Sequence, residues 1–380
     1  VSSIGNTAAE VEASLRAGKS GIVAAPDYAE HGFRCRVHGQ PNIVLEDHID
    51  KRDLRFMGDG AAYTFIAMDQ AVKDSGLSPE EVSNERTGII VGSGGPSTKS
   101  FFKAHNIVTE TGATKRIGPF GVTKGMSSTV SACLATPFKI KGVNYSITSA
   151  CSTSAHCIGN GTELIQMGKQ DIVFAGGGEE LDWTLSCLFD AMGAMSSKYN
   201  DTPDRASRTY DANRDGFVIS GGGGILVLEE LEHAEARGAK IHAEIVGFGT
   251  NSDGSHVTHA NPETMGIAMR LALDDAGLPP TAIPYVNAHG TATEQGDIAE
   301  TQATHGVFGE RVAISSLKSY MGHTLGACGA LEAWMSIEMM RDGWFAPTMN
   351  LETVDPRCGA LDYITGEGRR IDTDLAMSNN

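Results

Sequence analysis

The chain has 380 residues, 41% hydrophobic and 20% charged, which is enough to fold around one large core or two smaller ones. Its 30 Lys and Arg against 47 Asp and Glu give a net charge of −17, which excludes nucleic acid or an anionic membrane as partner of the surface as a whole. The 7 cysteines show no CxxC pair or disulfide framework, no apolar run reaches the about 20 residues of a membrane span, and no signal peptide is visible, so we expect a reduced, cytoplasmic protein.

Strands and helices alternate along the first half of the chain, which predicts an α/β fold. A helix capped by Asn6 is expected to run to Leu15, and a second from Lys51 to about Asp74, where Gly76 ends it. The glycines that follow the strand ending at Val91 match neither GxGxxG nor GxxxxGK[ST], so a nucleotide-binding fold is not supported. The strands are predicted at 86–91, 143–147, 171–175 and 217–229.

The same alternation begins again after about residue 244. No repeat is visible at the level of residues, but the order of elements predicts a second α/β half of similar layout. The strands are predicted at 244–249, 283–288 and 312–316, and the helices at 264–275, 297–305 and 325–341.

Cys151 lies where a predicted strand passes into a predicted helix. Residues 143–147 alternate between apolar and polar side chains, and residues 152–168 have helical spacing that ends at Gly168. Free N–H groups and the positive end of the dipole at a helix N-terminus favour a thiolate, so we expect a thiol pKa below the usual value of about 8.5. The alternative is that Cys151 is a small buried hydrophobic residue with no chemical role.

Two histidines, His289 and His323, lie in glycine-flanked turns at the ends of predicted strands, where a backbone can approach a ligand closely. A single histidine in such a turn is more often a hydrogen-bonded structural residue. Together with Lys318, five residues before His323, and with the turn at Cys151, the pair indicates cysteine–histidine chemistry.

A metal site and a serine hydrolase are less well supported. His256 and His259 have ligand-like spacing, but no HExxH motif and no cysteine pair accompanies them. No GxSxG sequence is present, so the strand–turn–helix nucleophile of a serine hydrolase has no counterpart.

Three motifs follow one another along the chain: Thr148-Ser149-Ala150-Cys151-Ser152-Thr153, His289-Gly290-Thr291-Ala292-Thr293-Glu294-Gln295-Gly296-Asp297 and Lys318-Ser319-Tyr320-Met321-Gly322-His323-Thr324-Leu325-Gly326-Ala327. Taken together and in this order, they resemble those of the 3-oxoacyl-acyl-carrier-protein synthases, the beta-ketoacyl-ACP synthases that catalyse condensation in fatty-acid synthesis. The resemblance runs over nearly the whole chain. Segments 143–159, 174–181 and 189–224 look most like the bacterial type I synthase, whereas 323–334 and 253–262 look closer to type II and polyketide synthases.

The resemblance implies a five-layer α-β-α-β-α, thiolase-like fold of two pseudo-symmetric halves, and a homodimer. Residues 1–245 would form the half with the cysteine, and residues 246–380 the half with both histidines. The family pattern also has a strand before Val1 and a phenylalanine- and glycine-containing loop with a last strand after Asn380, and neither is in this sequence.

The resemblance also implies the reaction. Cys151 would take an acyl chain from the phosphopantetheine of acyl carrier protein, and malonyl-carrier protein would then lose CO2 and attack the acyl-cysteine in a Claisen condensation. His289 and His323 would stabilise the developing negative charge, and Lys318 would set the local field and orient His323 or the leaving carboxylate. No metal or other cofactor is implied, because the substrates arrive on the carrier protein's phosphopantetheine.

Further positions match binding and structural residues of the family. Thr291 and Thr293 would hydrogen-bond the pantetheine arm, and Asp297 and Glu300 would be structural acids behind the histidines, with Glu300 meeting Lys318. Acyl carrier protein is acidic, so basic groups on this acidic chain would steer it, although such groups are more often simply a solvated helix face. The matching docking residues are Lys51, Arg52, Arg55, Lys115, Arg116 and Lys124.

Three alternatives stay open at this point. A polyketide-type ketosynthase shares the motifs, and a non-catalytic subunit of the chain-length-factor type shares the fold but normally lacks the nucleophilic cysteine that this chain has at position 151. A thiolase acting on coenzyme A uses a second cysteine as acid and base; Cys328 and Cys358 are available but lack the matching glycine-rich context.

Overall fold

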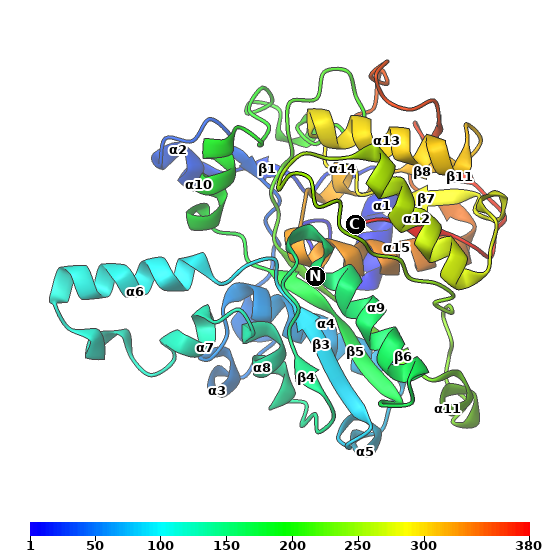
Figure 1. The fold of residues 1–380 in the computed structure, drawn as a ribbon. Coiled ribbons are helices and arrows are strands. Elements are labelled where there is room, and N and C mark those ends of the chain that lie inside the picture. The colour runs from blue at the N-terminus through cyan, green and yellow to red at the C-terminus, as the bar shows by residue number, and fades with distance from the viewer.

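Two four-stranded sheets form the centre of the molecule, and helices cover and separate them (Figure 1). The computed structural model describes every residue from Val1 to Asn380. The first sheet has the order β4-β3-β5-β6 and is parallel except for β6, which runs antiparallel to β5; the second has the order β10-β8-β7-β12 and is parallel throughout. The strands are β3 (Thr87–Gly92), β4 (Asn144–Tyr145), β5 (Ile172–Glu179), β6 (Gly222–Glu229), β7 (Tyr285–Asn287), β8 (Ala313–Ser315), β10 (Asp362–Tyr363) and β12 (Met377–Ser378).

The inner strands β3 and β5 of the first sheet are buried along their whole length, which explains their near-continuous runs of apolar residues and glycine. Ile89 and Val91 of β3 pack with α4 (Asp59–Ser75) and α8 (Thr129–Ala135), whereas Ile90, between them, packs with α9 (Thr153–Gln166). Successive side chains of a strand point to opposite faces, so one apolar strand serves two helical layers.

The second sheet separates two further sets of helices in the same way. Tyr285 of β7 packs with α1 (Ala8–Arg16) and α15 (Cys328–Asp342), and its neighbour Val286 lies in a core shared with α12 (Pro262–Ala276) and α13 (Glu294–Phe308). Helix α15 also contacts α9 and β6 of the first half. The layers therefore follow the order α4/α8, first sheet, α9/α15, second sheet, α12/α13, which is the five-layer arrangement expected.

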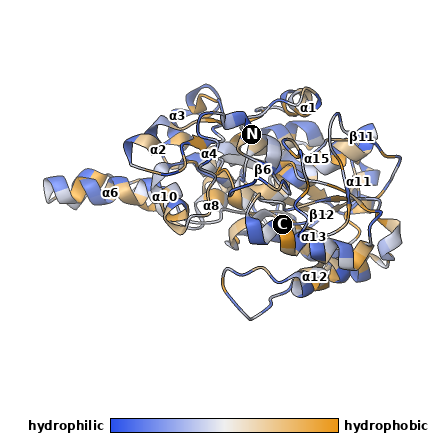
Figure 2. Ribbon diagram, turned by 90° about the horizontal axis from the view of Figure 1, so that it is seen from above, coloured by the Kyte–Doolittle hydropathy of each residue, from blue (hydrophilic) through white to orange (hydrophobic).

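An arm projects from this layered body. It consists of α6 (Thr98–Thr111), the short helix η2 (Thr114–Ile117) and α7 (Gly121–Gly125), and Figures 1 and 2 both show α6 extending well beyond the rest of the chain. No helix combines the length and apolar character that crossing a membrane requires. The remaining elements are β1 (Val23–Ala24), α2 (Pro26–Glu30), β2 (Val37–His38), η1 (Leu45–Asp47), α3 (Lys51–Leu54), α5 (Pro79–Val82), η3 (Ala150–Ser152), α10 (Trp183–Met192), η4 (Pro203–Arg205), α11 (Leu231–Ala236), η5 (Pro280–Ala282), α14 (Lys318–Met321), η6 (Leu325–Ala327), β9 (Trp344–Phe345) and β11 (Arg369–Arg370).

Two helix predictions need correction in detail. The helix expected from Lys51 to Asp74 is broken, since α3 ends at Leu54 and α4 starts only at Asp59 after an extended Gly58. The first helix is capped by Thr7 and not by Asn6, because the Thr7 hydroxyl accepts a hydrogen bond from the N–H of Glu10. Helical spacing of apolar residues indicates both helices but does not locate their ends.

Two strand predictions also differ from the structure. Residues 244–249 form no strand, because no neighbouring strand pairs with them; instead Gly247 and Gly249 lie directly against the backbone of α12. The strand expected from Phe217 begins only at Gly222, and residues 217–220 make single bridges to Met195, Gly39 and His323. Through the bridge from Ile219 to His323, the segment before β6 is attached to the turn that carries His323.

Candidate active site

Cys151 lies in η3, the short turn that leads directly into α9, as predicted from the residue pattern. Ala150, just before it, has a φ of +52°, which is an uncommon backbone conformation for a residue with a side chain. The Thr153 hydroxyl holds this turn: it donates to the Ala150 carbonyl at 2.7 Å and accepts from the Ser149 N–H at 2.9 Å. The sulfur is therefore presented by a turn fixed from both sides.

His323 is the partner of Cys151, with its Nε2 at 3.0 Å from Sγ. The N–H of Leu325 donates to the Nδ1 of the same ring at 3.2 Å, so Nδ1 is an acceptor and the neutral ring carries its proton on Nε2. The His323 side chain is buried. The backbone of His323 hydrogen-bonds to the backbone of Val218 and Ser220, which fixes the residue beside the cysteine. His323 thus presents an N–H donor to the sulfur.

His289 follows β7 and stands next to His323, with ring centroids 5.1 Å apart and planes at 86°. Its turn is held by Glu300, whose carboxylate oxygens accept from the N–H of His289 and of Gly290, both at 2.7 Å. The Nδ1 atom of His289 is buried without a hydrogen-bond partner. Two imidazoles from the second half of the chain therefore meet the cysteine of the first.

Lys318 is buried close to both rings. The expected contact between Lys318 and Glu300 is not formed. The Nζ of Lys318 donates to Oε1 of Glu332 at 2.6 Å, and both side chains are almost fully buried, at 1% and 0% exposure. Burial disfavours the ammonium, but Cys328 and Glu332 outweigh it and raise the pKa of Lys318. Glu300 is instead occupied by the two backbone amides of the His289 turn, which leaves Glu332 on α15 as the counter-ion.

The electrostatics of the site differ from the expectation for Cys151. Burial raises the pKa of its thiol to about 11, and the nearby charge of Lys318 offsets only part of this. The prediction of a thiol pKa below the usual value is therefore wrong, since the loss of water around the sulfur raises the pKa more than Lys318 lowers it. Burial and then Lys318 also lower the pKa of His289 and His323 far below the ordinary value, so both rings are neutral at pH 7.

One thiol and two imidazoles make a set that could also hold a metal ion. The ligand atoms of Cys151, His289 and His323 lie within 4.8 Å of one another. The buried ammonium of Lys318, which already lowers the pKa of both rings, would oppose a divalent cation at the same place. The charge distribution therefore favours chemistry on an anion that develops between the rings.

The remaining acidic and hydroxyl positions lie around the His289 turn. The hydroxyls of Thr291 and Thr293 are 2.8 Å apart, both side chains are half-buried, and Thr291 lines a large cavity. Asp297 accepts from the N–H of Ala292 at 3.1 Å and pairs with Arg214 at 3.2 Å, so it braces the turn from behind. Its structural interpretation fits these contacts.

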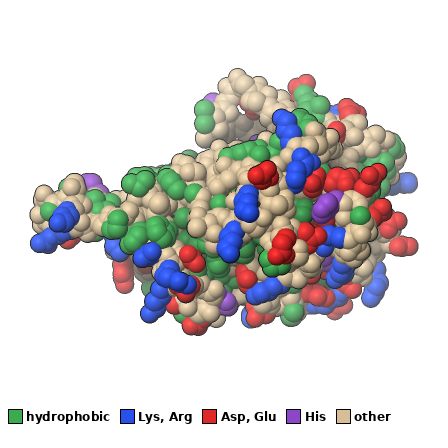
Figure 3. All heavy atoms as spheres, turned by 90° about the horizontal axis from the view of Figure 1, so that it is seen from below, with side chains coloured by type: hydrophobic (Ala, Val, Ile, Leu, Met, Phe, Trp, Pro, Cys, Tyr) green, Lys and Arg blue, Asp and Glu red, His purple; other side chains and the backbone are tan.

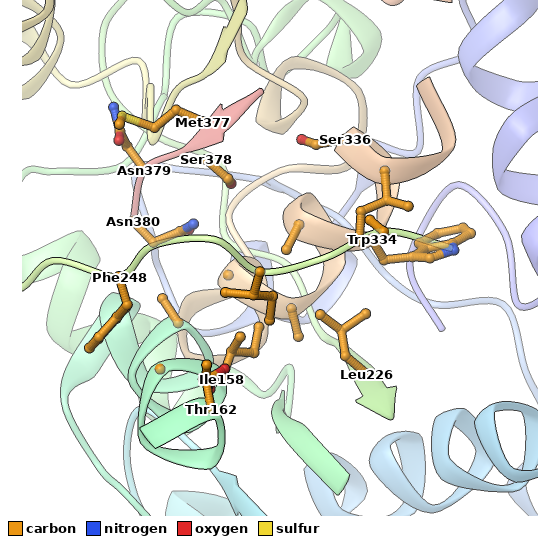
Figure 4. A pocket seen from close by; sticks show the side chains of 18 of the residues that line it. Ile158, Thr162, Leu226, Phe248, Trp334, Ser336, Met377, Ser378, Asn379 and Asn380 are labelled. Carbon is orange, nitrogen blue, oxygen red and sulfur yellow. Dashed lines mark hydrogen bonds between the residues drawn. The ribbon is translucent and has the colours of Figure 1, made fainter. Parts of the chain in front are cut away.

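A cavity of 1620 Å³ opens beside these residues. His289 and Thr291 belong to its lining, and Figure 4 shows its wall drawn from both halves of the chain, with Ile158 and Thr162 of α9 on one side and Met377 and Ser378 of β12 on the other. Much of the wall is apolar, so the cavity has room and lining for an extended, partly apolar molecule next to the two histidines.

The six basic residues fall into two groups. Lys51 and Arg52 lie on α3, and the Arg55 guanidinium lies 5.1 Å from the ring of Phe120, which brings α3 next to α7 and its Lys124. Figure 3 shows basic side chains both at the tip of the arm and on the body beside its base. Helix η2 packs on α6, so its pair Lys115 and Arg116 belongs to the arm.

Residue patterns alone did not reveal the two buried carboxylates that support the site. Glu332 is the single charged residue between positions 325 and 337, and a lone acid in such an apolar run was the available signal. Glu179 ends the apolar strand β5 after three glycines and accepts from the N–H of Gly326, next to Leu325. Neither stands in the cysteine or histidine motifs.

Comparison with known proteins identifies the family. The model of the beta-ketoacyl synthase N-terminal domain matches residues 1–234, and that of the C-terminal domain matches residues 242–352. The chain is 51% identical to 3-oxoacyl-[acyl-carrier-protein] synthase 1 of Haemophilus influenzae over 381 residues, which covers 100% of this chain and 93% of the relative.

Solved structures agree with this match. A beta-ketoacyl synthase from Burkholderia phymatum STM815 superposes with a TM-score of 0.95 at 44% identity, covering 100% of this chain and 93% of the other. The ketosynthase in a structure of a type II polyketide synthase acyl-carrier protein in complex with its ketosynthase (AntDE:AntF) gives 0.88 at 28% identity, covering 100% and 93%. The thiolase-like five-layer fold is thereby confirmed, and the chain belongs to the beta-ketoacyl synthase family.

Proposed function

We propose that this protein is a beta-ketoacyl-ACP synthase, an acyltransferase that elongates fatty acids by decarboxylating Claisen condensation of an acyl-cysteine with malonyl-ACP. The observation that carries the proposal is the contact of 3.0 Å between Sγ of Cys151 and Nε2 of His323, with the ring of His289 beside it. A nucleophile and two neutral N–H donors around one point are what acyl transfer followed by enolate formation requires.

In the first half-reaction, the sulfur of Cys151 attacks the thioester carbonyl of the acyl-carrier protein. A new C–S bond forms, the bond to the pantetheine sulfur breaks, and the thiol proton leaves Cys151 and ends on the departing pantetheine thiolate. Because burial raises the pKa of the thiol to about 11, the resting sulfur keeps its proton at pH 7 and gives it up in the acyl-transfer step.

In the second half-reaction, malonyl-ACP loses its carboxylate as CO2, and the electron pair of the broken C–C bond forms an enolate. The Nε2–H groups of His323 and His289 donate to the thioester oxygen, where negative charge develops. The enolate carbon then attacks the acyl-cysteine carbonyl, and the C–S bond breaks to release Cys151 and 3-oxoacyl-ACP. Removing one such donor typically lowers the rate by about 10²–10³.

Lys318 serves this chemistry through its charge and not by contact. Burial is the main reason that the pKa of both imidazoles lies far below the ordinary value, and the ammonium of Lys318, paired with Glu332, lowers it further, so neither ring becomes a cation at the working pH. Neutral rings can donate N–H hydrogen bonds to the enolate without protonating it. The reaction needs no metal or other cofactor in this scheme, because the phosphopantetheine arm belongs to the substrate. The proposal includes hydrogen bonds from Thr291 and Thr293 to that arm.

Acyl carrier protein is the partner that we propose for the basic surface at α3 and α7. Supports are the exposed Lys51, Arg52 and Arg55 on an otherwise acidic chain, and the carrier protein bound to the related ketosynthase described above. Lys115 and Arg116 on the arm would extend this surface. We also propose a division into halves near residue 245, a homodimer and a cytoplasmic location.

These last three proposals have separate supports. Each half has its own four-stranded sheet, which supports the division near residue 245. The arm exposes Phe101 by 57% and Val122 by 77%, which supports a second copy packing on it. All 7 cysteines are free thiols, which supports a reducing compartment.

The test of the reaction is condensation of a medium-chain acyl-ACP with malonyl-ACP by the purified protein. We expect 3-oxoacyl-ACP and CO2 from the wild type and neither from Cys151→Ala, while Cys358→Ala, outside the site, stays active. Condensation by the Cys151→Ala variant would refute the assignment of the nucleophile. A wild-type protein that binds the carrier but forms no product would favour the non-catalytic subunit.

The test of docking is charge reversal of Arg55 and Lys124 to Glu in one variant. We expect a higher KM for acyl-ACP, most marked at low ionic strength, with unchanged rates on a small pantetheine thioester. Lys73→Glu, an exposed reversal on α4, is the matched control. Equal losses for both substrates would show that the reversal harms the site and not docking.

A further inference from the structure

Glu179 is a buried carboxylate that connects three separate parts of the chain around the site. It is the last residue of β5, with 1% of its surface exposed. Its Oε1 accepts from the hydroxyl of Ser93 at 2.8 Å, and its Oε2 accepts from the N–H of Gly94 at 2.7 Å and of Gly326 at 3.0 Å. The ends of β3 and β5 are thereby joined to the turn that follows His323.

The close packing around this carboxylate leaves no freedom in how it binds. A Cβ atom on Gly326 would lie 2.3 Å from the nitrogen of Gly94 and 2.9 Å from Oε2 of Glu179, and a Cβ on Gly94 would lie 2.7 Å from the same oxygen. Only glycine at both positions lets one carboxylate oxygen reach both amides. A buried carboxylate is costly unless it is hydrogen-bonded, and here it has three donors.

The turn that Glu179 holds determines the proton position on His323. Gly326 follows Leu325, whose N–H donates to Nδ1 of His323 at 3.2 Å. Leu325 has a φ of +46°, a conformation that costs about 1–3 kcal/mol and persists only where the surroundings impose it. The bond from Gly326 to Glu179 is made by the very next amide, so it is well placed to impose this conformation.

We propose that Glu179 is a positioning residue which, through Gly326, keeps the Leu325 N–H on Nδ1 of His323 and so keeps the ring proton on Nε2, facing Cys151. The inference rests on the proposed function for its consequence in catalysis. The tautomer itself is a property of the ring that can be measured whether or not the protein condenses acyl chains.

Glu180 provides a matched control, because it is the next residue and is also a buried carboxylate. Its oxygens accept from the Ser97 hydroxyl at 2.7 Å and the Lys99 N–H at 3.2 Å, at the start of the arm helix α6. It therefore shares burial, charge and chain position with Glu179 but has no bond to the His323 turn.

The experiment is ¹⁵N NMR of protein labelled at histidine, with the His323 signals assigned by their loss in His323→Ala. Wild type is expected to show a protonated Nε2 and an acceptor Nδ1. In Glu179→Ala the tautomer should become mixed, and condensation by the full chain should fall about 10²-fold in kcat with little change in KM, the loss typical of a misplaced group. Glu179→Gln, whose amide oxygen can still accept from both glycine N–H groups, should restore both readouts, and Glu180→Ala should leave the tautomer unchanged.

An unchanged tautomer in a folded Glu179→Ala variant, or an equal change in Glu180→Ala, would overturn the inference. If Glu179→Ala does not fold, Glu179→Asp withdraws the carboxylate by one methylene and should give the same mixed tautomer; a wild-type tautomer there also overturns the inference. If Glu179→Ala shifts the tautomer but the wild-type protein catalyses no condensation, the inference stands and the proposed function is refuted.

Discussion

Replacing Lys318 by Met tests the buried ion pair on which the electrostatics of the site depend. Lys318 and Glu332 are both inaccessible to solvent, and the second carboxylate oxygen of Glu332 has no partner, so the variant leaves Glu332 with no favourable contact. Removing one partner of a buried pair typically destabilises a protein by about 3–5 kcal/mol. Removing both, as in Lys318→Met/Glu332→Leu, is often neutral, so the double variant should recover most of the loss.

The loss should depend on pH in a definite direction. Burial raises the pKa of Glu332 to about 7 even with Lys318 present, and without the ammonium it must rise further. A carboxyl whose pKa is higher in the folded than in the unfolded protein binds more protons when folded, so folding stability falls as the pH rises above about 4.5. The single variant should therefore be only mildly destabilised at pH 5 and much more at pH 8.

The assay is guanidinium denaturation of the wild type, the single and the double variant at both pH values. Lys73→Met, which removes an exposed pair on α4, is the control and should cost less than about 1 kcal/mol. In the folded double variant, Lys318 no longer lowers the pKa of His289 and His323. The condensation rate, plotted against pH, should therefore begin to fall on the acid side (the acid limb) at a higher pH than in the wild type. A single variant as stable as the double at pH 8, or an unmoved acid limb, would refute the reasoning.

Three other predictions concern the same site. Because burial raises the pKa of Cys151 to about 11, its alkylation by iodoacetamide, measured against Cys151→Ala, should rise about tenfold per pH unit from 7 to 10; a plateau below pH 8 would contradict this. Arg214→Met should cost about 3–5 kcal/mol in denaturation, since its buried guanidinium pairs with Asp297 and donates to the Thr293 carbonyl. Thr291→Val and Thr293→Val should each raise KM for pantetheine thioesters about 2- to 12-fold, the loss of one hydrogen bond, whereas Cys151 alkylation should not change.

The turn around Cys151 shows how far residue patterns reach. Helical spacing up to Gly168 placed the cysteine just before a helix, and α9 indeed starts at Thr153. The predicted direction of the pKa shift of Cys151 was wrong. The shift depends on how much protein surrounds the sulfur, and no local sequence pattern contains that information. The same holds for Lys318, whose partner Glu332 comes from another helix and replaced the expected Glu300.

The boundaries of elements depended on neighbours in the same way. Residues 244–249 have the composition of a strand, but a strand exists only where another strand accepts its backbone hydrogen bonds, and none pairs with this segment. The long helix expected after Lys51 is interrupted at Gly58, where the chain passes into the packed helix α4.

The sequence alone determined the alternation of strands and helices, the two-half organisation that we propose, and the three motifs that carry Cys151, His289 and His323. These are local properties, since they depend on residue type and spacing along the chain. Only the tertiary structure decided which charge meets Lys318, which amide selects the tautomer of His323, and whether the sulfur of Cys151 is a thiol or a thiolate at rest. Those outcomes depend on burial and on contacts between distant segments, which arise only when both sheets and the helices between them have packed.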